Sequence, residues 1–428
     1  MSHLNYLEKL LDGVEVVWLP LGDIAEIYGG LTGKSKADFE SGNAKYISYK
    51  NIFNNIDVDP DQLELVKLSK NERQNKVRYG DILFTGSSEI AVEAGMSSAV
   101  TIDFKEPVYL NSFSFGVRFN DDIKLMPEFS KYLFRSRFMR SDITKSANGV
   151  TRFNVSKARF KKILVPIPCP DNPEKSLAIQ SEIVRILDKF TALTAELTAE
   201  LTAELNMRKK QYNYYRDKLL SFEEGEVEWK TLGEVALDFG RGKSKHRPRN
   251  DPSLYGGDIP FIQTGDIRNA AHTIQKYSQT YSELGLKQSK LWPKGTLCIT
   301  IAANIAETSI LGFDACFPDS VIGFVANPEE TSSSYVEYLL SSIKTQLEEK
   351  GQGSAQSNIN LGTFQNLKLP FPLITDQERI VALLDKFELL TNSITEGLPR
   401  EIELRQKQYE YYRDLLLNFP KSHSNEVA

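Results

Sequence analysis

Two long segments of the chain place apolar residues at helical spacing. In residues 171–222 and 375–428, Leu, Ile and Val recur every three or four positions among charged residues, which predicts amphipathic helices. An Asn-Pro pair at residues 172–173 is typical of a helix start. Thr375 with Glu378 three residues later predicts a capping box at the start of the second helix.

The two helical segments differ in continuity. No glycine or proline interrupts the first one before Leu220, so one unbroken helix is predicted there. The second segment contains Gly397 and Pro399. Because proline removes a backbone donor and starts helices more readily than it continues them, we predict a kink or break at this place.

Most of the remaining sequence alternates short strand-like runs with glycine-bounded turns. Runs rich in β-branched and aromatic residues occur at 45–49, 81–86, 259–263 and 295–301, and residues 127–140 have a helical pattern. Strands and helices mixed in this way predict an α+β fold for both stretches.

The helical segments are two copies of one sequence. Residues 180–222 align without a gap on residues 377–419, with identical residues at 23 of 43 positions. The similarity continues upstream, where VPIP at 165–168 matches LPFP at 369–372. The chain therefore contains an internal duplication.

Between the duplicated borders lie two inserts, residues 29–156 and 240–361, which are similar in length but align poorly. Constant borders around different inserts predict two domains that perform the same kind of task on different targets. The expected divisions are an N-terminal insert domain at 1–170, a central helix at 171–222, a second insert domain at 223–374 and a C-terminal helical region at 375–428.

Composition limits the class of protein. A chain of 428 residues that is 41% hydrophobic is long enough for two domains with separate cores. Its three cysteines are too few and too far apart for a disulfide framework, which favours a reducing compartment. No segment approaches the roughly 18 apolar residues of a membrane-spanning helix, so we expect a cytoplasmic protein.

Positive charge gathers locally although the net charge is −5. Residues 131–162 hold ten Lys and Arg side chains against one acidic residue, and they include a glycine-containing loop at 146–157. Such a loop offers phosphate contacts and hydrogen bonds to base edges, and the alternative is a solvated basic helix and loop. The DNA-contact candidates in this region are Lys145, Asn148, Thr151, Arg152, Asn154, Lys157 and Arg159.

The second insert carries its own candidates. A basic run at 240–249 contains glycines, which suit a close approach of the backbone to phosphate, and the polar segment 351–360 matches the loop of the first insert. Because that segment is uncharged, we expect it to read bases by hydrogen bonds. The candidates are Arg241, Lys243, Lys245, Arg247, Gln356 and Asn358.

Inside the first helix the tetrapeptide TAEL stands three times in succession, at residues 194–205. Each unit lengthens a helix by about 6 Å and turns its end by about 40°, while one base pair advances about 3.4 Å and turns roughly 34–36°. This geometry suggests a spacer that resets two DNA readers by about one base pair per repeat. The spacer positions are Thr194, Leu197, Thr198, Leu201, Thr202 and Leu205.

Other motifs are interpreted as structural. The run GGLTGKS at 29–35 fails the phosphate-loop pattern because Tyr28 stands where the first glycine is required. The four histidines are scattered outside any metal-ligand spacing, so no metal site is expected. Tyr212, Tyr214 and Tyr215, with their counterparts in the second copy, are expected to pack against a helix or a partner.

The duplicated borders, with ILDKF at 186–190, QYxYYRDxLLxF at 211–222 and the TAEL run, closely resemble the specificity subunits of type I restriction-modification systems, in particular type IC. This resemblance implies two target recognition domains and two long helices that pair as an antiparallel coiled coil. It implies that the number of tetrapeptides sets the gap between two halves of a DNA target. The implied partners are double-stranded DNA, two modification subunits that use S-adenosylmethionine, and restriction subunits that use ATP and Mg²⁺, with no cofactor in this chain.

Two other classes stay open at this point. The chain is alternatively a self-contained nuclease or methyltransferase, or a free-standing DNA-binding regulator. The sequence contains no N-P-P-[FY] motif of adenine methylation and no convincing nuclease cluster. Neither alternative explains why constant frames surround unlike inserts.

Overall fold

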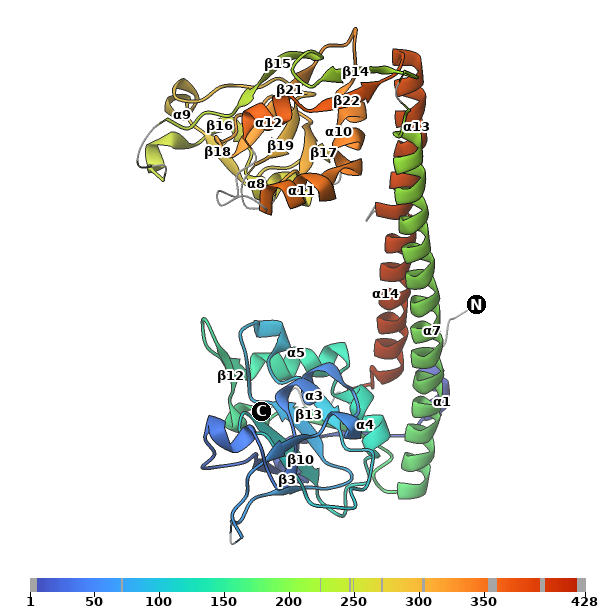
Figure 1. Cartoon of the computed structure of the whole chain (residues 1–428). Helices are drawn as coiled ribbons and strands as arrows, with labels where there is room; N and C mark the ends of the chain where they lie inside the picture. The colour runs from blue at the N-terminus through green and yellow to red at the C-terminus, as the bar shows by residue number, and fades with distance from the viewer. Residues whose placement is uncertain are drawn as a thin grey trace. The chain divides into compact units, whose positions relative to one another are not determined.

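The computed structural model describes residues 6–70, 72–223, 225–245, 248, 250–270, 272–301, 305–352, 360–392 and 397–421. The chain divides into two compact units (Figure 1). Unit 1 comprises Met1–Leu197 and Arg405–Ala428, and unit 2 comprises Thr198–Leu404. Unit 1 therefore takes residues from both ends of the chain, as a circular repeat requires.

The described residues of unit 1 form four small sheets, ordered β2-β10-β6-β8, β4-β3-β9-β5, β11-β12-β7 and β1-β13. Its strands are β1 (Val16–Pro20), β2 (Ala25–Gly29), β3 (Ala44–Ile47), β4 (Glu64–Val66), β5 (Lys76–Val77), β6 (Ile82–Thr85), β7 (Ser87–Ser88), β8 (Ser97–Ala99), β9 (Val108–Leu110), β10 (Ser114–Phe119), β11 (Ala147–Asn148), β12 (Phe153–Val155) and β13 (Leu164–Pro168). Its helices are α1 (Tyr6–Leu11), α2 (Leu21–Ile24), α3 (Tyr49–Asn54), α4 (Pro127–Leu133), α5 (Arg137–Lys145) and α6 (Lys157–Phe160), with parts of α7 (Pro173–Leu219) and α14 (Gly397–Leu417).

The core of unit 1 forms around β6. All four residues of this strand are buried, because β10 and β8 flank it and apolar side chains cover both faces. The ring of Phe84 lies 5.5 Å from that of Phe115 and 4.9 Å from that of Phe160, measured between centroids. The continuous apolar run at 81–86 is thus a buried strand, as predicted.

Unit 2 has a five-stranded sheet, ordered β15-β21-β19-β20-β17, and two-stranded sheets β14-β22 and β16-β18. Its strands are β14 (Glu228–Thr231), β15 (Ala236–Arg241), β16 (Tyr255–Phe261), β17 (Thr273–Ile274), β18 (Gln279–Tyr281), β19 (Leu297–Thr300), β20 (Thr308–Leu311), β21 (Val321–Ala326) and β22 (Lys368–Phe371). Its helices are α8 (Thr264–Asn269), α9 (Glu283–Lys287), α10 (Ser333–Ser342), α11 (Lys344–Gln352), α12 (Leu361–Gln365) and α13 (Ile374–Asn392), with the remaining parts of α7 and α14.

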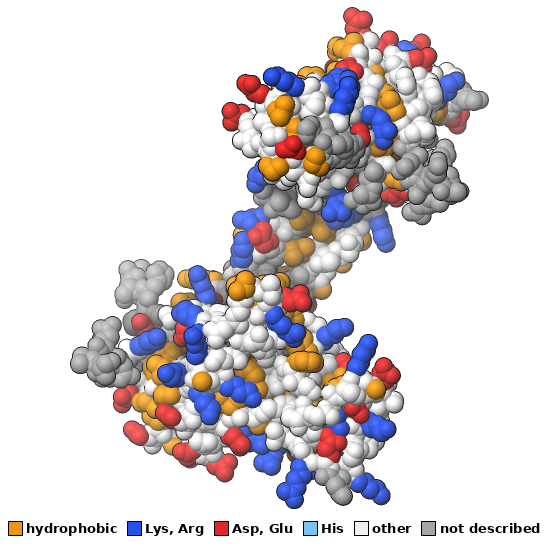
Figure 2. Space-filling model, turned by 90° about the vertical axis from the view of Figure 1, so that its left-hand side faces the viewer, with side chains coloured by type: hydrophobic (Ala, Val, Ile, Leu, Met, Phe, Trp, Pro, Cys, Tyr) orange, Lys and Arg blue, Asp and Glu red, His pale blue; other side chains and the backbone are white. Residues whose placement is uncertain are grey.

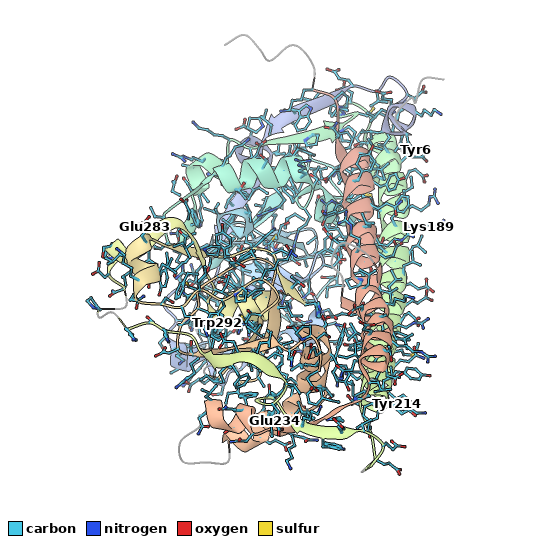
Figure 3. All side chains as sticks on the ribbon, turned by 90° about the horizontal axis from the view of Figure 1, so that it is seen from above. Tyr6, Lys189, Tyr214, Glu234, Glu283 and Trp292 are labelled. Carbon is cyan, nitrogen blue, oxygen red and sulfur yellow. The ribbon has the colours of Figure 1, made fainter. Side chains whose placement is uncertain are left out.

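The core of unit 2 repeats the plan of unit 1. Strand β19 is wholly buried between β21 and β20, as β6 is between its neighbours. Trp292 is fully buried, and its ring stacks on Phe317 with centroids 5.2 Å apart (Figure 3). Tyr214, by contrast, lies on α7 with 61% of its surface exposed.

We call α7, α13 and α14 the frame helices. In unit 1 the ring of Phe190 on α7 stacks on Tyr412 of α14, with centroids 5.6 Å apart, and the hydroxyls of Thr191 and Tyr409 lie 3.0 Å apart. Since rising numbers on α7 meet falling numbers on α14, the two helices run antiparallel, as expected. In unit 2, Tyr215 on α7 stacks on Phe387 of α13 at 6.1 Å, which repeats the same pairing of matched positions.

Each insert is tied to a frame helix by one matched tyrosine and aspartate. The Tyr132 hydroxyl donates to Asp188 Oδ1 at 2.7 Å in unit 1, and the Tyr338 hydroxyl donates to Asp385 Oδ1 at 2.6 Å in unit 2. Asp188 and Asp385 occupy equivalent places in the duplicated sequence. The repeated borders therefore hold different inserts through equivalent contacts.

A buried glutamine adds a second equivalent contact in each unit. Gln180 donates from Nε2 to the carbonyl oxygen of Lys124 at 2.8 Å, and Gln377 donates from Nε2 to that of Glu330 at 2.9 Å. Both glutamines are at most 2% exposed. Because a buried amide without partners is costly, each glutamine fixes the insert backbone against its helix.

The predicted helix ends are partly right. The first frame helix runs unbroken from Pro173 to Leu219, and the side chain of Asn172 accepts from the backbone N–H of Lys175 at 3.1 Å. The capping box at Thr375 is wrong, because α13 already begins at Ile374 and the Leu373 carbonyl accepts the first helical bonds.

Two further helix predictions are settled by the structure. The helix predicted at 127–140 is two helices, α4 and α5, since a turn at residues 134–136 separates them. Helix α13 ends at Asn392 and α14 begins at Gly397, with Pro399 in its first turn. None of the described helices is both long and apolar enough to cross a membrane.

Removing the hydroxyl in Tyr132→Phe should loosen unit 1 selectively, because Asp188 loses the hydrogen bond from Tyr132. The expected cost is about 1–2 kcal/mol of unfolding free energy. Hydrogen–deuterium exchange should show faster exchange in α4 and in residues 173–197, with unit 2 unchanged. Tyr214→Phe, at an exposed hydroxyl, is the control. Equal loss of protection in both units would contradict the assignment.

Candidate nucleic-acid interface

The loop predicted to contact DNA is a β-hairpin that projects from unit 1. Strands β11 and β12 pair in antiparallel register, and β12 also pairs with β7. Gly149 has φ +144°, and a Cβ there would lie 1.9 Å from the carbonyl oxygen of Arg152, so the turn requires glycine. Val150 at the tip is 92% exposed. The hairpin therefore presents its turn to solvent.

The structure brings the seven predicted residues of the first insert to one region of the surface. All seven are exposed: Lys145, Asn148, Thr151, Arg152, Asn154, Lys157 and Arg159. Arg159 donates from Nη1 to Asn148 Oδ1 at 2.7 Å, and Lys145 lies 3.1 Å from Asp142. These contacts are between exposed groups, so the side chains stay accessible to a ligand.

Arg152 is held more firmly than its neighbours. Its Nε and Nη2 donate to the Ser87 hydroxyl at 3.1 and 3.0 Å, and its guanidinium carbon lies 5.9 Å from the centre of the Phe113 ring. Phe113 is itself 66% exposed. The guanidinium is thus orientated by a hydroxyl and an aromatic ring while it remains at the surface.

A pocket of about 470 Å³ lies beside this arginine. Tyr49 and Phe53 stack in it with ring centroids 5.9 Å apart, and the Tyr49 hydroxyl donates to the Ser87 carbonyl at 2.9 Å. The pocket is lined by Tyr49, Phe53, Ser87, Ser88, Glu89, Ile90, Glu93, Phe113 and Arg152.

Apart from Arg152, none of these lining residues was predicted from the sequence. They come from α3, β7, two loops and the hairpin, so no local spacing joins them. One feature of the sequence could have pointed to the pocket, namely an apolar residue at a position that proves to be exposed. Ile90 is such a residue and is 52% exposed.

Three members of the basic run at 131–162 are structural and do not belong to the exposed patch. Arg135 donates to the backbone carbonyls of Ile52, Phe53, Asn55 and Ser97, and Arg140 donates to those of Val92, Ala94 and Gly95. Burial lowers the pKa of each guanidinium to about 10, so both stay charged at neutral pH.

The third structural residue of the run is Lys131. It pairs with Asp57 at 3.1 Å and with Asp188 at 3.3 Å, and its side chain is 11% exposed. The basic patch is therefore smaller than the run of charges suggested, because charge along the sequence does not report which side chains are buried.

Lys and Arg side chains gather on the face of unit 1 that carries β12, with apolar side chains among them (Figure 2, lower part). A surface of this kind suits DNA, since cations contact phosphates while apolar groups meet base methyl groups or sugars.

In unit 2, Arg241 ends β15, and Lys243 and Lys245 follow it; all three are exposed. The nearby Gly242 is buried, and a Cβ there would lie 2.2 Å from the Phe317 carbonyl oxygen. This glycine is needed for internal packing, which corrects the interpretation that it serves phosphate approach. Arg247, Gln356 and Asn358 lie outside the described residues.

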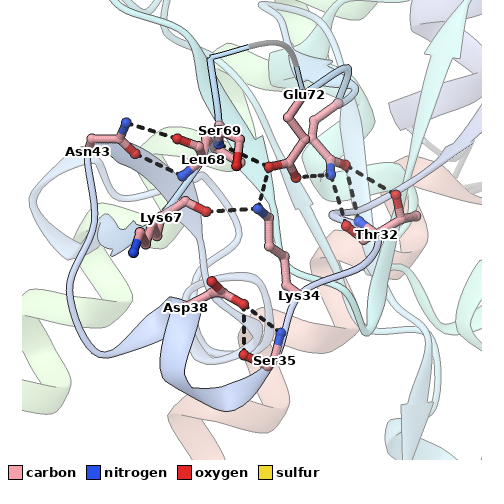
Figure 4. Close-up of polar contacts among 10 residues, drawn as sticks. Thr32, Lys34, Ser35, Asp38, Asn43, Lys67, Leu68, Ser69 and Glu72 are labelled. Carbon is pink, nitrogen blue, oxygen red and sulfur yellow. Dashed lines mark hydrogen bonds and ion pairs between the residues drawn. The ribbon is translucent and has the colours of Figure 1, made fainter.

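The GKS motif of the first insert is a structural loop (Figure 4). Lys34 Nζ donates to Glu72 Oε2 at 2.6 Å and to the Lys67 carbonyl at 2.8 Å, and the Lys34 side chain is 6% exposed. The hydrogen bond from Lys34 is the main reason why the pKa of Glu72 falls to about 2. A lysine held in this way is not free to bind phosphate, in agreement with the rejected phosphate-loop pattern.

The predicted spacer residues all lie on α7. Leu197, Leu201 and Leu205 are half-buried, whereas Leu193 is 51% exposed. Thr202 donates its hydroxyl proton to the Thr198 carbonyl at 2.7 Å, and Thr194 is half-buried. Across the described residues, no group of three or more His, Cys, Asp or Glu side chains is arranged to hold a metal ion. His272 packs against Tyr338 and pairs with Glu337.

Comparison with known proteins assigns the family. Residues 14–207 and 224–404 match the family described as Type I restriction modification DNA specificity domain, so both repeats are covered. The chain belongs to this family. The EcoR124I/EcoR124II specificity subunit of Escherichia coli is 40% identical over 98% of each chain. The EcoprrI specificity subunit of the same organism is 36% identical over 92% of this chain and 93% of its own length.

Solved structures show the same fold. A chain from a study of complex assembly and conformational transition of the type I R-M system superposes with a TM-score of 0.67, at 17% identity, over 94% of this chain and 97% of that one. The HsdS subunit from Thermoanaerobacter tengcongensis gives a TM-score of 0.52 at 16% identity, over 94% of this chain and 95% of that one. The resemblance to type I specificity subunits seen in the sequence is confirmed, and the type IC subgroup stays a prediction.

If Lys145 and Lys157 contact phosphates, replacing both with Gln should weaken DNA binding and reduce the slope of log affinity against log salt by about two. The measurement is affinity for duplex DNA between about 50 and 200 mM salt. Arg140→Gln is the contrasting variant, because it should lower stability by about 2–4 kcal/mol while folded protein keeps its salt slope. An unchanged slope in the double lysine variant would remove these residues from the interface.

Proposed function

We propose that this chain is the DNA sequence-specificity subunit of a type I restriction-modification complex. Unit 1 reads one half of a bipartite DNA target and unit 2 reads the other. The observation that carries this proposal is the duplicated frame: equivalent Tyr–Asp and Gln contacts hold two inserts of unlike sequence, and the family match covers both. A frame that keeps its contacts while its inserts differ suits two readers with different targets.

The proposed division of the chain follows the duplication. Recognition domains occupy residues 1–170 and 223–374, the central helix with the spacer occupies 171–222, and the C-terminal helical region occupies 375–428. The hairpin of unit 1 and the basic end of β15 in unit 2 are the proposed DNA contacts, since each exposes cations beside polar loops.

The chemistry belongs to partners in this proposal. Two modification subunits methylate adenine with S-adenosylmethionine, and restriction subunits hydrolyse ATP with Mg²⁺ and cut DNA, while this chain carries no cofactor and no catalytic group. The name "restriction enzyme specificity subunit" of the relatives supports this separation. Free cysteines at all three positions and a DNA target favour the cytoplasm.

Two equivalent partners are also supported by matched exposure on the frame helices. Tyr214 and Tyr411 occupy the same place in the duplicated sequence and are 61% and 63% exposed. Large aromatic side chains are enriched in protein interfaces. A surface repeated in this way suits the same partner bound twice.

Deleting residues 198–201, one TAEL unit, should shorten the gap between the half-sites by about one base pair and leave both half-sites unchanged. The gap is measured by genome-wide mapping of methylated adenines in a host that carries the variant. Thr198→Ala keeps the helix length and should keep the gap. A changed half-site with an unchanged gap would refute the spacer role.

Exchanging residues 240–361 for the insert of another family member should replace one half-site and preserve the other, because the helix side of the frame contacts, Asp385 and Gln377, lies outside the exchanged segment. The same mapping of methylated adenines provides the measurement. Loss of the half-site read by unit 1 would contradict independent readers.

A further inference from the structure

The pocket of unit 1 brings the acidic side chains of Glu89 and Glu93 and the basic side chain of Arg152 to one place, and Glu93 accepts a hydrogen bond from the Ser88 hydroxyl. Glu89 directly follows β7, is exposed and lines the pocket together with Arg152. Within the described part of the chain, Glu89 makes no hydrogen bond or ion pair. Arg152 is bonded to Ser87, two residues before Glu89. Both side chains therefore line one pocket beside β7.

A free carboxylate is unexpected on a face that binds phosphates. Phosphate repels a carboxylate, and no ion pair within the described residues holds Glu89 at this place. A carboxylate at a DNA interface is favourable where it accepts a hydrogen bond from an exocyclic amino group, and cytosine N4 is the usual partner in the major groove.

The arginine has matching chemistry. Two N–H groups of Arg152 are bonded to Ser87, and the ring of Phe113 lies beside the guanidinium. Three of its five N–H groups stay available on a fixed plane. Guanine O6 and N7 accept two parallel hydrogen bonds from such a plane.

We propose that this pocket reads one G·C base pair of the half-site assigned to unit 1, with Arg152 donating to guanine and Glu89 accepting from cytosine. The proposal rests on the proposed function as a specificity subunit and names the base pair that one reader selects. Exposed Ile90 and Phe113 border the site and exclude water from the two polar contacts.

The second insert has a different residue at the matched place. Strand β19 corresponds to β6, and Thr300 aligns with Thr85. Four residues after these threonines, the first insert reads EIA and the second insert reads NIA. In the sequence Asn304, which lies outside the described residues, therefore aligns with Glu89. Asparagine forms hydrogen bonds with adenine, whereas glutamate accepts one from cytosine. The residue at this aligned position therefore differs between the two inserts as expected for readers of different bases.

The test uses the complex with its methyltransferase partners and the target mapped by methylated adenines. Duplexes carry this target with each base pair of one half-site replaced in turn by the other three pairs. Methylation rates are compared for wild type, Glu89→Gln, Glu89→Asn and Arg152→Lys. Glu40→Gln, at an exposed carboxylate of the same domain outside the pocket, is the matched control.

We expect Glu89→Gln and Arg152→Lys to lose discrimination at one and the same position, a G·C pair, by about five- to 150-fold. Other positions and Glu40→Gln should keep wild-type discrimination. Glu89→Asn should move the preference at that position towards A·T. Methylation at the other half-site, unchanged in all variants, shows that the proteins are folded and assembled.

Effects at two separate positions, at a pair other than G·C, or equally on all duplexes would overturn the proposal. So would full discrimination in Glu89→Gln. If the wild-type complex methylates no bipartite sequence, the proposed function itself fails. If the wild-type complex has a bipartite target and neither Glu89→Gln nor Arg152→Lys changes its discrimination, only the base-pair assignment fails and the proposed function stands.

Discussion

The structure depends on the polar contacts between each insert and a frame helix. The hydroxyls of Tyr132 and Tyr338 reach Asp188 and Asp385, and in each unit a buried glutamine amide bonds the insert backbone. Buried polar groups need partners in fixed directions, so these contacts set the orientation of the insert as well as its attachment. Because these contacts recur in both units, each insert is attached to its frame helix in the same way.

This constraint explains how unlike inserts share one architecture. A wholly buried central strand, β6 or β19, provides the core of each domain and tolerates substitution among apolar residues of similar volume. In unit 1 the residues that follow β7, Glu89 and Ile90, are exposed. Variation is thus concentrated where packing does not restrict it, which is what a family of readers with different targets requires.

Burial also divides the positive charge of unit 1 into two roles. Arg135 binds backbone carbonyls of α3 and β8, and Arg140 binds those of the segment that precedes β8, so both hold these elements together from within. Lys157 and Arg159 stand on the surface, where phosphate is accessible. Basic residues of one run therefore differ in what they contact: Arg140 on α5 contacts backbone carbonyls of its own unit, whereas Lys157 and Arg159 on α6 are exposed.

The sequence by itself determined the duplication, the unbroken helix α7, the buried strands and the family, since each is a local or repeated pattern and periodicity reports which face is covered. It did not determine the separation of α4 from α5 or the start of α13, where turn geometry and neighbouring carbonyls decide. The pocket around Arg152 was decided by tertiary structure alone. Ser87, Phe113 and Arg152 are distant in sequence and meet because β7 pairs with β12, and no pattern along the chain encodes that meeting.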